Sequence, residues 1–453
     1  MSIKKFPFEI RPLEPELDEK IKSLYLGANE GSVEIGPKKY VISSKYGQVA
    51  ETVYNFEVRP DDVWVVTFPR SGTTLMQEMT WLILNDDYDT AKNVSLFKRF
   101  PFLEQISTLI RFKMNINKFP FEIRPLEAEL DDKIKSLFLG ANEGCVEIGP
   151  KKYIISSKYG QAAETIYNFE VRPDDVWVVT FPRSGTTLMQ EMAWLILNDD
   201  NDTAKNASLL KRFPFLELST LCPDHVIAET TEHIVNDQKM WQEYKESMKP
   251  QWEVLENTVG RRFIKSHLPL SLLPPTLLTS GAKVVYIARN PKNAIISRYY
   301  QERSLRMTNY VGNFEQYWDL FEKNLMYFTP YWEHLEEAWQ QRSNKNLSFF
   351  FFDDVIKDYK KAIVELSNFL EKTMSDEQIS KLADYLHIDN FRGRPQVNFM
   401  LKIISVRDPY QHVRTGKSGV WDEYFTQELE ARANKWIEEN YKNTTLRFPI
   451  KLY

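Results

Sequence analysis

The chain has 453 residues, of which 43% are hydrophobic and 27% are charged, and its formal net charge is −5 at pH 7. This balance is typical of a globular protein, and the length suggests two or three domains. The acidic excess argues against a broad surface for nucleic acid or for an anionic membrane, so we expect neither partner.

The cysteines and the apolar runs bear on the cellular compartment. The first residues lack an apolar segment of signal-peptide length, and no later run approaches the ~18 apolar residues of a membrane span. Cys145 and Cys222 are the only cysteines, which is too few for a disulfide framework and suits a reducing compartment. We therefore expect a cytoplasmic protein.

A segment of 101 residues near the start of the chain occurs twice. At an offset of 113 residues, 4–104 align with 117–217, and 89 of the 101 aligned positions are identical. One copy has too few strands for a covered parallel sheet, and only the second copy is joined directly to the rest of the chain. We therefore expect residues 117–453 to form the complete domain, and 1–116 to be a partial duplicate without its own catalytic site. Exchange of the duplicate between chains and its absence from the cellular protein both stay open.

The second copy contains the run VWVVTFPRSGTTLMQEMAW, which predicts a short strand, a tight loop and the first turn of a helix. The first N–H groups of a helix lack partners and lie at its positive end, so they can bind phosphate or sulfate. Gly185 would let the backbone approach an oxyanion closely, and Arg183 would add a fixed charge. Hydroxyl donors come from Ser184, Thr186 and Thr187. The alternative is an ordinary Ser/Thr-capped helix after a buried strand.

Further along the chain, the hydrophobic pattern predicts alternating helices and strands. They are a helical stretch over 237–257 that Pro250 interrupts, strands over 262–267, 283–288 and 346–352, helices over 292–303 and from 353 to 370, a loop rich in Gly and Arg over 391–419, and a last helix over 426–441. This alternation favours an α/β fold, a P-loop-like, doubly wound parallel sheet with helices on both faces. Ligands of such sheets bind at the carboxyl ends of the strands.

Three further groups of side chains could carry chemistry. Lys265 and His267 end one predicted strand, and Arg289 ends the next, with Ser297 two helical turns later. A basic glycine-rich loop, RTGKSG, begins at Arg414. Together with the anion-binding loop, they supply two separable groups of anion donors and one imidazole.

A nucleotide kinase or related phosphotransferase is one alternative function. A P-loop nucleotide-hydrolysing enzyme needs the run Gly-x4-Gly-Lys-Ser/Thr and usually an Asp that binds magnesium. Here no Lys follows Gly185, but an apolar run ends at Phe352-Asp353, so phosphoryl transfer stays open. A non-catalytic nucleotide-binding scaffold is the other alternative.

These motifs together resemble the cytosolic sulfotransferase family. TFPRSGTT is similar to its 5′-phosphosulfate loop, and VVYIARNPKNAIISRYY to its 3′-phosphate segment. FIKSHLP resembles its catalytic KTHLP strand, and VRTGKSGVWDEYFT its C-terminal RKGxxGxWxxxFT loop. The resemblance runs through 117–453 with the order and spacing of the motifs kept, whereas 4–104 match only the N-terminal third of the family.

The resemblance implies transfer of a sulfuryl group from 3′-phosphoadenosine 5′-phosphosulfate (PAPS) to a hydroxyl or amine of a small, apolar acceptor such as a phenol or a sterol. His267 would be the general base, and Lys265 and Arg183 would offset the charge on the leaving phosphate. The residues implied to bind the donor are Arg183, Ser184, Gly185, Thr186, Thr187, Leu188, Arg289, Ser297, Phe352, Arg414, Thr415 and Gly416. No metal is expected, because fixed cations replace the magnesium of kinases.

The chain departs from the family pattern at several positions. Leu188 stands where many members have a Trp that stacks on adenine, Phe352 where a Tyr is common, and Thr415 where a Lys is usual. The usual dimer motif wants Lys, Thr-Val and Glu. This chain has Asp422, Thr426-Gln427 and Glu430 there. A homodimer therefore stays open, but its usual motif is incomplete.

Overall fold

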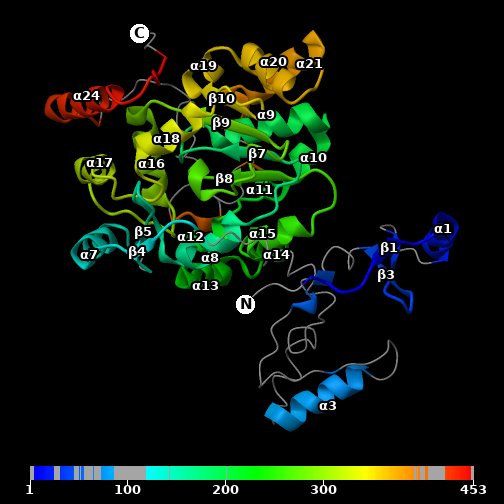
Figure 1. The fold of residues 1–453 in the computed structure, drawn as a ribbon. Coiled ribbons are helices and arrows are strands. Elements are labelled where there is room, and N and C mark those ends of the chain that lie inside the picture. Colours follow the sequence, from blue (N-terminus) through cyan, green and yellow to red (C-terminus); the bar gives the residue numbers. More distant parts are fainter. Residues whose placement is uncertain are drawn as a thin grey trace. The chain divides into compact units, whose positions relative to one another are not determined.

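The structure is a computed structural model that describes most of the chain. The described residues are 5–24, 31–44, 50–51, 53–55, 65, 73–85, 119–141, 143–199, 201–391, 394, 396–397, 403–406 and 424–449. The chain divides into two compact units, 1–116 and 117–453, and each is considered by itself (Figure 1). Within the described ranges, no helix has both the length and the apolar character needed to cross a bilayer.

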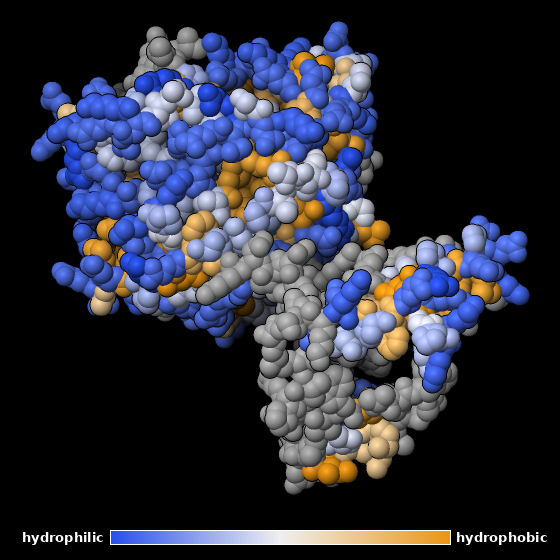
Figure 2. Space-filling model, viewed as in Figure 1, coloured by the Kyte–Doolittle hydropathy of each residue, from blue (hydrophilic) through white to orange (hydrophobic). Residues whose placement is uncertain are grey.

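The first unit contains a small antiparallel sheet and two described helices. Its elements are β1 (Ile10–Pro12), α1 (Pro15–Leu24), β2 (Ser32–Ile35), β3 (Tyr40–Ser43) and α3 (Thr73–Asn85), and its strand order is β1-β2-β3. Several large apolar side chains are exposed in it, and Figure 2 shows apolar surface around α3. Tyr40 is 64% exposed, whereas its counterpart in the second copy, Tyr153, is 2% exposed. Near-identical segments therefore have opposite environments.

The second unit is built around a parallel sheet with the strand order β10-β9-β7-β8. Its strands are β7 (Val176–Val179), β8 (Phe263–Ser266), β9 (Lys283–Ala288) and β10 (Leu347–Phe351). They lie side by side in the middle of the unit, with helices around them (Figure 1). This confirms the predicted α/β fold. A second, antiparallel sheet has the order β4-β5-β6, from β4 (Ile123–Pro125), β5 (Cys145–Ile148) and β6 (Tyr153–Ser156).

Helices cover both faces of the parallel sheet. Along β7, Val176 and Val178 join one apolar cluster, and Trp177 and Val179 join the other, as alternating side chains of a strand require. The helices of this unit are α7 (Ala128–Leu137), α8 (Ser157–Tyr167), α9 (Thr186–Asn198), α10 (Asn201–Asn206), α11 (Leu209–Arg212), α12 (Leu218–Leu221), α13 (Asp224–Ile234), α14 (Gln238–Ser247), α15 (Gln251–Glu256), η1 (Leu270–Leu272), α16 (Pro291–Ser304), α17 (Phe314–Glu322), α18 (Tyr331–Gln340), α19 (Phe352–Lys357), α20 (Tyr359–Phe369), α21 (Asp376–Leu386), α22 (Ile388–Phe391) and α24 (Gln427–Tyr441).

One predicted helix is divided in the structure. The segment after Asp353 was expected to run through Leu370 as one helix, but α19 ends at Lys357 and α20 begins at Tyr359. Asp358 lies between them with a ψ of 85°, and its carboxylate accepts a 2.9 Å hydrogen bond from the backbone N–H of Lys361. The side chain caps the second helix, and the backbone at this residue is therefore not helical.

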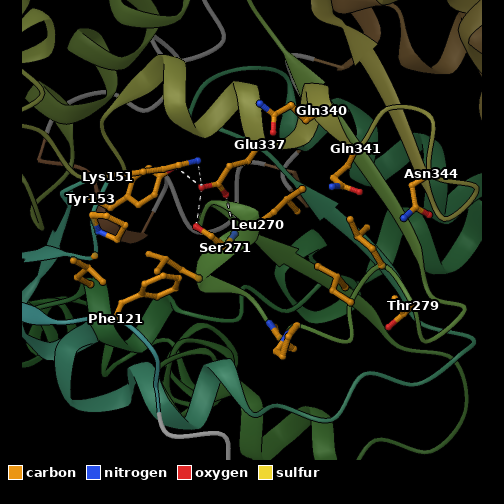
Figure 3. Close-up of a pocket in the computed structure, with 18 residues that line it drawn as sticks. Phe121, Lys151, Tyr153, Leu270, Ser271, Thr279, Glu337, Gln340, Gln341 and Asn344 are labelled. Carbon is orange, nitrogen blue, oxygen red and sulfur yellow. Dashed lines mark hydrogen bonds and ion pairs between the residues drawn. The ribbon is translucent and has the colours of Figure 1, made fainter. Parts of the chain in front are cut away.

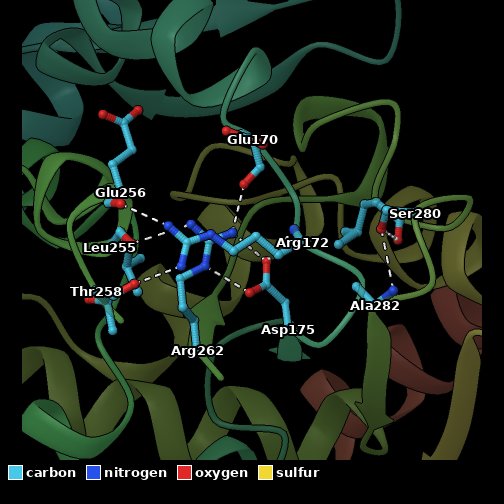
Figure 4. Close-up of polar contacts among 10 residues, drawn as sticks. Glu170, Arg172, Asp175, Leu255, Glu256, Thr258, Arg262, Ser280 and Ala282 are labelled. Carbon is cyan, nitrogen blue, oxygen red and sulfur yellow. Dashed lines mark hydrogen bonds and ion pairs between the residues drawn. The ribbon is translucent and has the colours of Figure 1, made fainter. Parts of the chain in front are cut away.

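A buried ion pair joins the amino ends of two neighbouring strands of the parallel sheet, β7 and β8 (Figure 4). Asp175 precedes β7 and Arg262 precedes β8, and both side chains are fully buried. The guanidinium donates to the two carboxylate oxygens over 2.7 and 2.5 Å, and to the carbonyls of Glu170 (2.7 Å) and Leu255 (3.3 Å). Because both charges are paired and hydrogen-bonded, the ion pair fixes the alignment of β7 and β8 at their amino ends.

Candidate active site

The turn from β7 into α9 has a backbone that requires glycine at one position. Arg183 and Gly185 have φ values of 68° and 112°, and Gly185 is the N-cap of α9. A Cβ on Gly185 would lie 2.7 Å from Cδ2 of Phe352, so both the space and the backbone exclude a side chain. The hydroxyl of Ser184 is buried and has no hydrogen-bond partner among the described residues. The start of α9 therefore has a buried hydroxyl donor, Ser184, that no described residue satisfies.

Two arginines converge on this turn. Nε of Arg183 donates to Oγ of Ser297 over 3.0 Å, and Nη1 of Arg289 donates to the carbonyl of Arg183 over 3.0 Å. The guanidinium of Arg289 also lies 4.3 Å from the ring centroid of Phe352. Arg183, from the loop, thus contacts Ser297 and Arg289, which the sequence placed in another group of donors. The structure thus brings the loop, the end of β9 and α16 together.

Burial shapes the electrostatics of both arginines. It lowers the pKa of Arg183 to about 10, to which the positive charge of Arg289 also contributes, and it lowers the pKa of Arg289 to about 10. Both groups therefore stay protonated at neutral pH. Nε of Arg289 is buried and has no hydrogen-bond partner in the part of the chain that the structure describes. Buried charged donors without partners are costly, which is typical of a site for an anion.

The imidazole of His267 lies at the end of the neighbouring strand. Val179 pairs with Ser266, so the next residues, Thr180 and His267, lie level with each other. Nδ1 of His267 is 2.8 Å from the carbonyl oxygen of Thr180 and must donate to it, which leaves Nε2 with a free electron pair. Burial, and then the charge of Lys265, lower the pKa of His267 well below its ordinary value. The ring is therefore neutral at pH 7 and can accept a proton.

The backbone of His267 is held from two sides by residues that the sequence did not single out. Its N–H donates to Oε1 of Glu217 over 2.6 Å, and Oε2 of Glu217 accepts from Ser266 over 3.0 Å. Its carbonyl accepts from Nε2 of His334 over 2.8 Å, and Nδ1 of His334 accepts from Tyr286 over 2.8 Å. Burial raises the pKa of Glu217 to about 7. No local motif marks these residues.

Lys265 lies in β8, two residues before His267. Its Nζ is 4.1 Å from the ring centroid of Phe215, which also makes an edge contact with His267 at a centroid distance of 5.1 Å. Burial lowers the pKa of Lys265 to about 8, against the opposing effect of Glu217. Part of the lysine population is therefore neutral in mildly alkaline solution. Phe328 completes the apolar wall, with its ring centroid 5.7 Å from that of His267.

The helix that carries His334 is itself fixed by Glu337, one turn later (Figure 3). Glu337 accepts hydrogen bonds from Lys151 at 2.9 Å, from Tyr153 at 2.8 Å, and from the N–H and hydroxyl of Ser271 at 2.8 Å each. These bonds tie η1, which follows His267 closely, to α18 and β6. A pocket of about 450 Å³ opens beside Glu337, and its described lining includes none of the predicted site residues.

The remaining predicted residues have mixed outcomes. Thr186 begins α9, and its hydroxyl lies 2.6 Å from that of Thr180, while Leu188 is buried in the apolar cluster that contains α9. Thr187 lies in the first turn of the same helix. The predicted contacts from Arg414, Thr415 and Gly416 lie outside the described residues. Within the described ranges, no group of three or more His, Cys, Asp or Glu residues could hold a metal ion.

Comparison with known proteins gives consistent matches. A family model described as a sulfotransferase domain matches residues 60–149 and 173–445. Sulfotransferase 1E1 of Bos taurus is 27% identical over 303 residues, which are 65% of this chain and 92% of the relative. Luciferin sulfotransferase of Photinus pyralis is 29% identical over 313 residues, which are 66% of this chain and 80% of the relative.

Solved structures give matches of similar extent. A crystal structure of retinol dehydratase with retinol and PAP is 34% identical, with a TM-score of 0.67, and covers 73% of this chain and 99% of that one. Another structure of retinol dehydratase, with androsterone and the inactive cofactor PAP, is 34% identical, also with a TM-score of 0.67, and covers 73% of this chain and 98% of that one.

Proposed function

Because this chain belongs to the sulfotransferase family, we propose that residues 117–453 transfer the sulfuryl group of PAPS to the hydroxyl of a small, apolar acceptor at the site around His267. The observation that carries this assignment is a pair of buried donors without described partners, the Ser184 hydroxyl in the turn before α9 and Nε of Arg289, whose Nη1 contacts that turn. Phenyl rings beside His267 suit an apolar acceptor, as do the retinol and androsterone found with the structural neighbour.

The residues present fit the donor nucleotide. The turn before α9 offers backbone N–H groups at a position where any side chain would collide with Phe352, and an anion can therefore approach closely. Arg183, Ser184, Thr186 and Thr187 would hold the 5′-phosphosulfate, and Arg289 and Ser297 the 3′-phosphate. The bound donor supplies the sulfuryl group, which leaves adenosine 3′,5′-bisphosphate behind when the bond between sulfur and the 5′-phosphate oxygen breaks.

The residues around His267 would perform the proton transfer. Nε2 takes the proton of the acceptor hydroxyl as the acceptor oxygen bonds to sulfur, while the bond from Nδ1 to the Thr180 carbonyl keeps the tautomer and ring orientation. Lys265 and Arg183 offset the negative charge that develops on the phosphate side. A positioned general base contributes about 10²- to 10⁴-fold to the rate.

We also propose that residues 1–116 have no independent activity. The first copy holds no counterpart of His267 or Arg289, because the repeat ends before those strands begin. Residues 60–149 and 173–445 match the family model separately, and these matches begin 113 residues apart, which is the offset of the repeat. Deletion of 1–116 should therefore leave kcat/KM within about twofold. A loss of transfer would show that the first unit contributes to the site.

The proposal extends to compartment and assembly. Cys145 and Cys222 are buried and free, which supports a reducing compartment such as the cytoplasm. Glu430 accepts a 2.9 Å hydrogen bond from Lys292 of the same chain. Because the rest of the usual dimer motif is incomplete, we propose that a homodimer of this chain would not depend on that motif.

The direct test is product analysis. The full chain is incubated with labelled PAPS and a panel of phenols, sterols and retinoids, and formation of adenosine 3′,5′-bisphosphate is followed with and without acceptor. Acceptor-dependent release supports the proposal. Formation of ADP from ATP in its place would support the kinase alternative. His267→Ala should abolish turnover while nucleotide binding, measured by calorimetry, stays close to that of the unchanged chain.

A further inference from the structure

A small cavity lies among residues that neighbour the aromatic rings around His267. Its volume is about 20 Å³, and its lining includes Phe138, Cys145, Arg298, Glu302, Met326 and Tyr327. That volume holds about one water-sized oxygen. The cavity therefore matches the end of a ligand rather than a whole one.

The cavity adjoins the base through two chain segments. Tyr327, which lines it, precedes Phe328, whose ring packs on the imidazole of His267. The guanidinium carbon of Arg298 lies 5.3 Å from the ring centroid of Phe181, and Phe181 follows the threonine that holds Nδ1 of His267. The cavity thus lies behind the aromatic rings that face His267, and we take an acceptor at His267 to extend past these rings into it.

Arg298 lines this cavity and carries a charged guanidinium. The residue is 2% exposed, and its Nε donates to Oε1 of Glu302 over 2.7 Å. Oε2 of Glu302 accepts from the hydroxyl of Tyr317 over 2.5 Å. Nη1 of Arg298 is buried and has no hydrogen-bond partner within the described ranges. A buried donor of this kind is expected to find an acceptor atom.

The pairing with Glu302 decides which acceptor atom suits Nη1. The carboxylate cancels the net charge of the guanidinium, and the surrounding side chains are mostly apolar. A second carboxylate or sulfate would place an unpaired negative charge in this setting, whereas a ketone oxygen would not. The cavity therefore favours a neutral oxygen.

We propose that Arg298 is a specificity-determining residue, whose Nη1 donates a hydrogen bond to a second, neutral oxygen of the acceptor. The enzyme then prefers hydroxyl acceptors that also carry a ketone to acceptors of the same shape that lack it. The inference rests on the proposed sulfotransferase function and narrows its acceptor class. A hydrogen bond from a charged donor corresponds to a preference of about 10- to 100-fold.

Matched acceptors test the preference. One pair is estrone and its 17-deoxo analogue, and the other is 4-hydroxyacetophenone and 4-ethylphenol. Both kcat/KM and the Kd of each acceptor in the complex with adenosine 3′,5′-bisphosphate are measured. At least one pair should favour the ketone by about 10-fold or more, in Kd as well as in kcat/KM. Equal values for both pairs overturn the inference.

A variant separates the hydrogen bond from structural effects. Arg298→Met combined with Glu302→Gln avoids leaving a buried charge unpaired, and Tyr317→Phe, which removes a neighbouring hydrogen bond but keeps both charges, is the control. The ketone preference should fall to about 1 in the double variant and persist in the control. If water alone fills the cavity in the complex, the ratio will be the same in all three proteins, which refutes the role of Arg298. Absence of turnover with a retained Kd preference would refute only the proposed function.

Discussion

The alkaline limit of activity should be set by Lys265, and replacement of this residue by arginine should remove that limit. Burial lowers the lysine pKa to about 8, and only the protonated form can offset charge on the leaving phosphate. For the unchanged chain, kcat/KM for the donor should therefore halve near pH 8 and fall to about one tenth of its maximum at pH 9. Arginine stays charged through this range, so Lys265→Arg should have similar values at pH 7 and pH 9, whatever its absolute rate.

The assay is initial-rate release of adenosine 3′,5′-bisphosphate between pH 6 and 10, with a saturating aliphatic alcohol whose hydroxyl does not titrate there. Lys283→Arg is the matched control, because that lysine pairs with exposed Glu371 at the opposite edge of the sheet. The same data should show no acid loss between pH 7.5 and 6.5, because the pKa of His267 lies well below its ordinary value. A decline near pH 8 that persists in Lys265→Arg would refute this reasoning.

Three further predictions concern Gly185, Arg262 and Glu217. Gly185→Ala should lower kcat/KM for the donor at least 10-fold, whereas Gly260→Ala, which has a φ of 79° and open space around it, should only lower stability, by about 1–2 kcal/mol in urea unfolding. Arg262→Met should destabilise the chain by about 3–5 kcal/mol, because Asp175 stays buried without its ion-pair partner; a loss below 1 kcal/mol would contradict the pairing. Glu217 has a folded-state pKa raised to about 7, so its contribution is present below pH 4.5 and lost as pH rises through 7. The unfolding free energy of Glu217→Gln, relative to the unchanged chain, should therefore increase across that window; a flat difference would count against it.

The strands of the parallel sheet and the turn from β7 into α9 could be predicted from the sequence. The strand over 283–288 has the predicted bounds, because a strand buried on both faces must be a continuous apolar run. The turn before α9 was recognisable because glycine and hydroxyl residues stand next to each other where a strand meets a helix. Such features depend on residues that are neighbours in the sequence, so they can be predicted without knowledge of the tertiary contacts.

The residues that hold the backbone of His267 could not be predicted from the sequence. Glu217 and His334 lie 50 and 67 residues from His267 and contact only its backbone, which any residue would offer. The contact between Arg183 and Ser297 depends on a left-handed backbone at Arg183 that its residue type does not suggest. The break at Asp358 was missed for a related reason, since a capping aspartate is an ordinary residue until the chain turns there.

The buried charges at the amino ends of the parallel strands are paired, whereas buried hydrogen-bond donors at the carboxyl ends have no described partner. At the amino ends, Asp175 and Arg262 neutralise each other, while Ser184 and Arg289 at the carboxyl ends retain buried donors that no described side chain meets. A nucleotide that supplies the missing oxygens binds the native state alone, and at a hundred times its Kd it adds about 2.7 kcal/mol to the unfolding free energy. The lifetime of this protein in a cell would then follow the supply of activated sulfate.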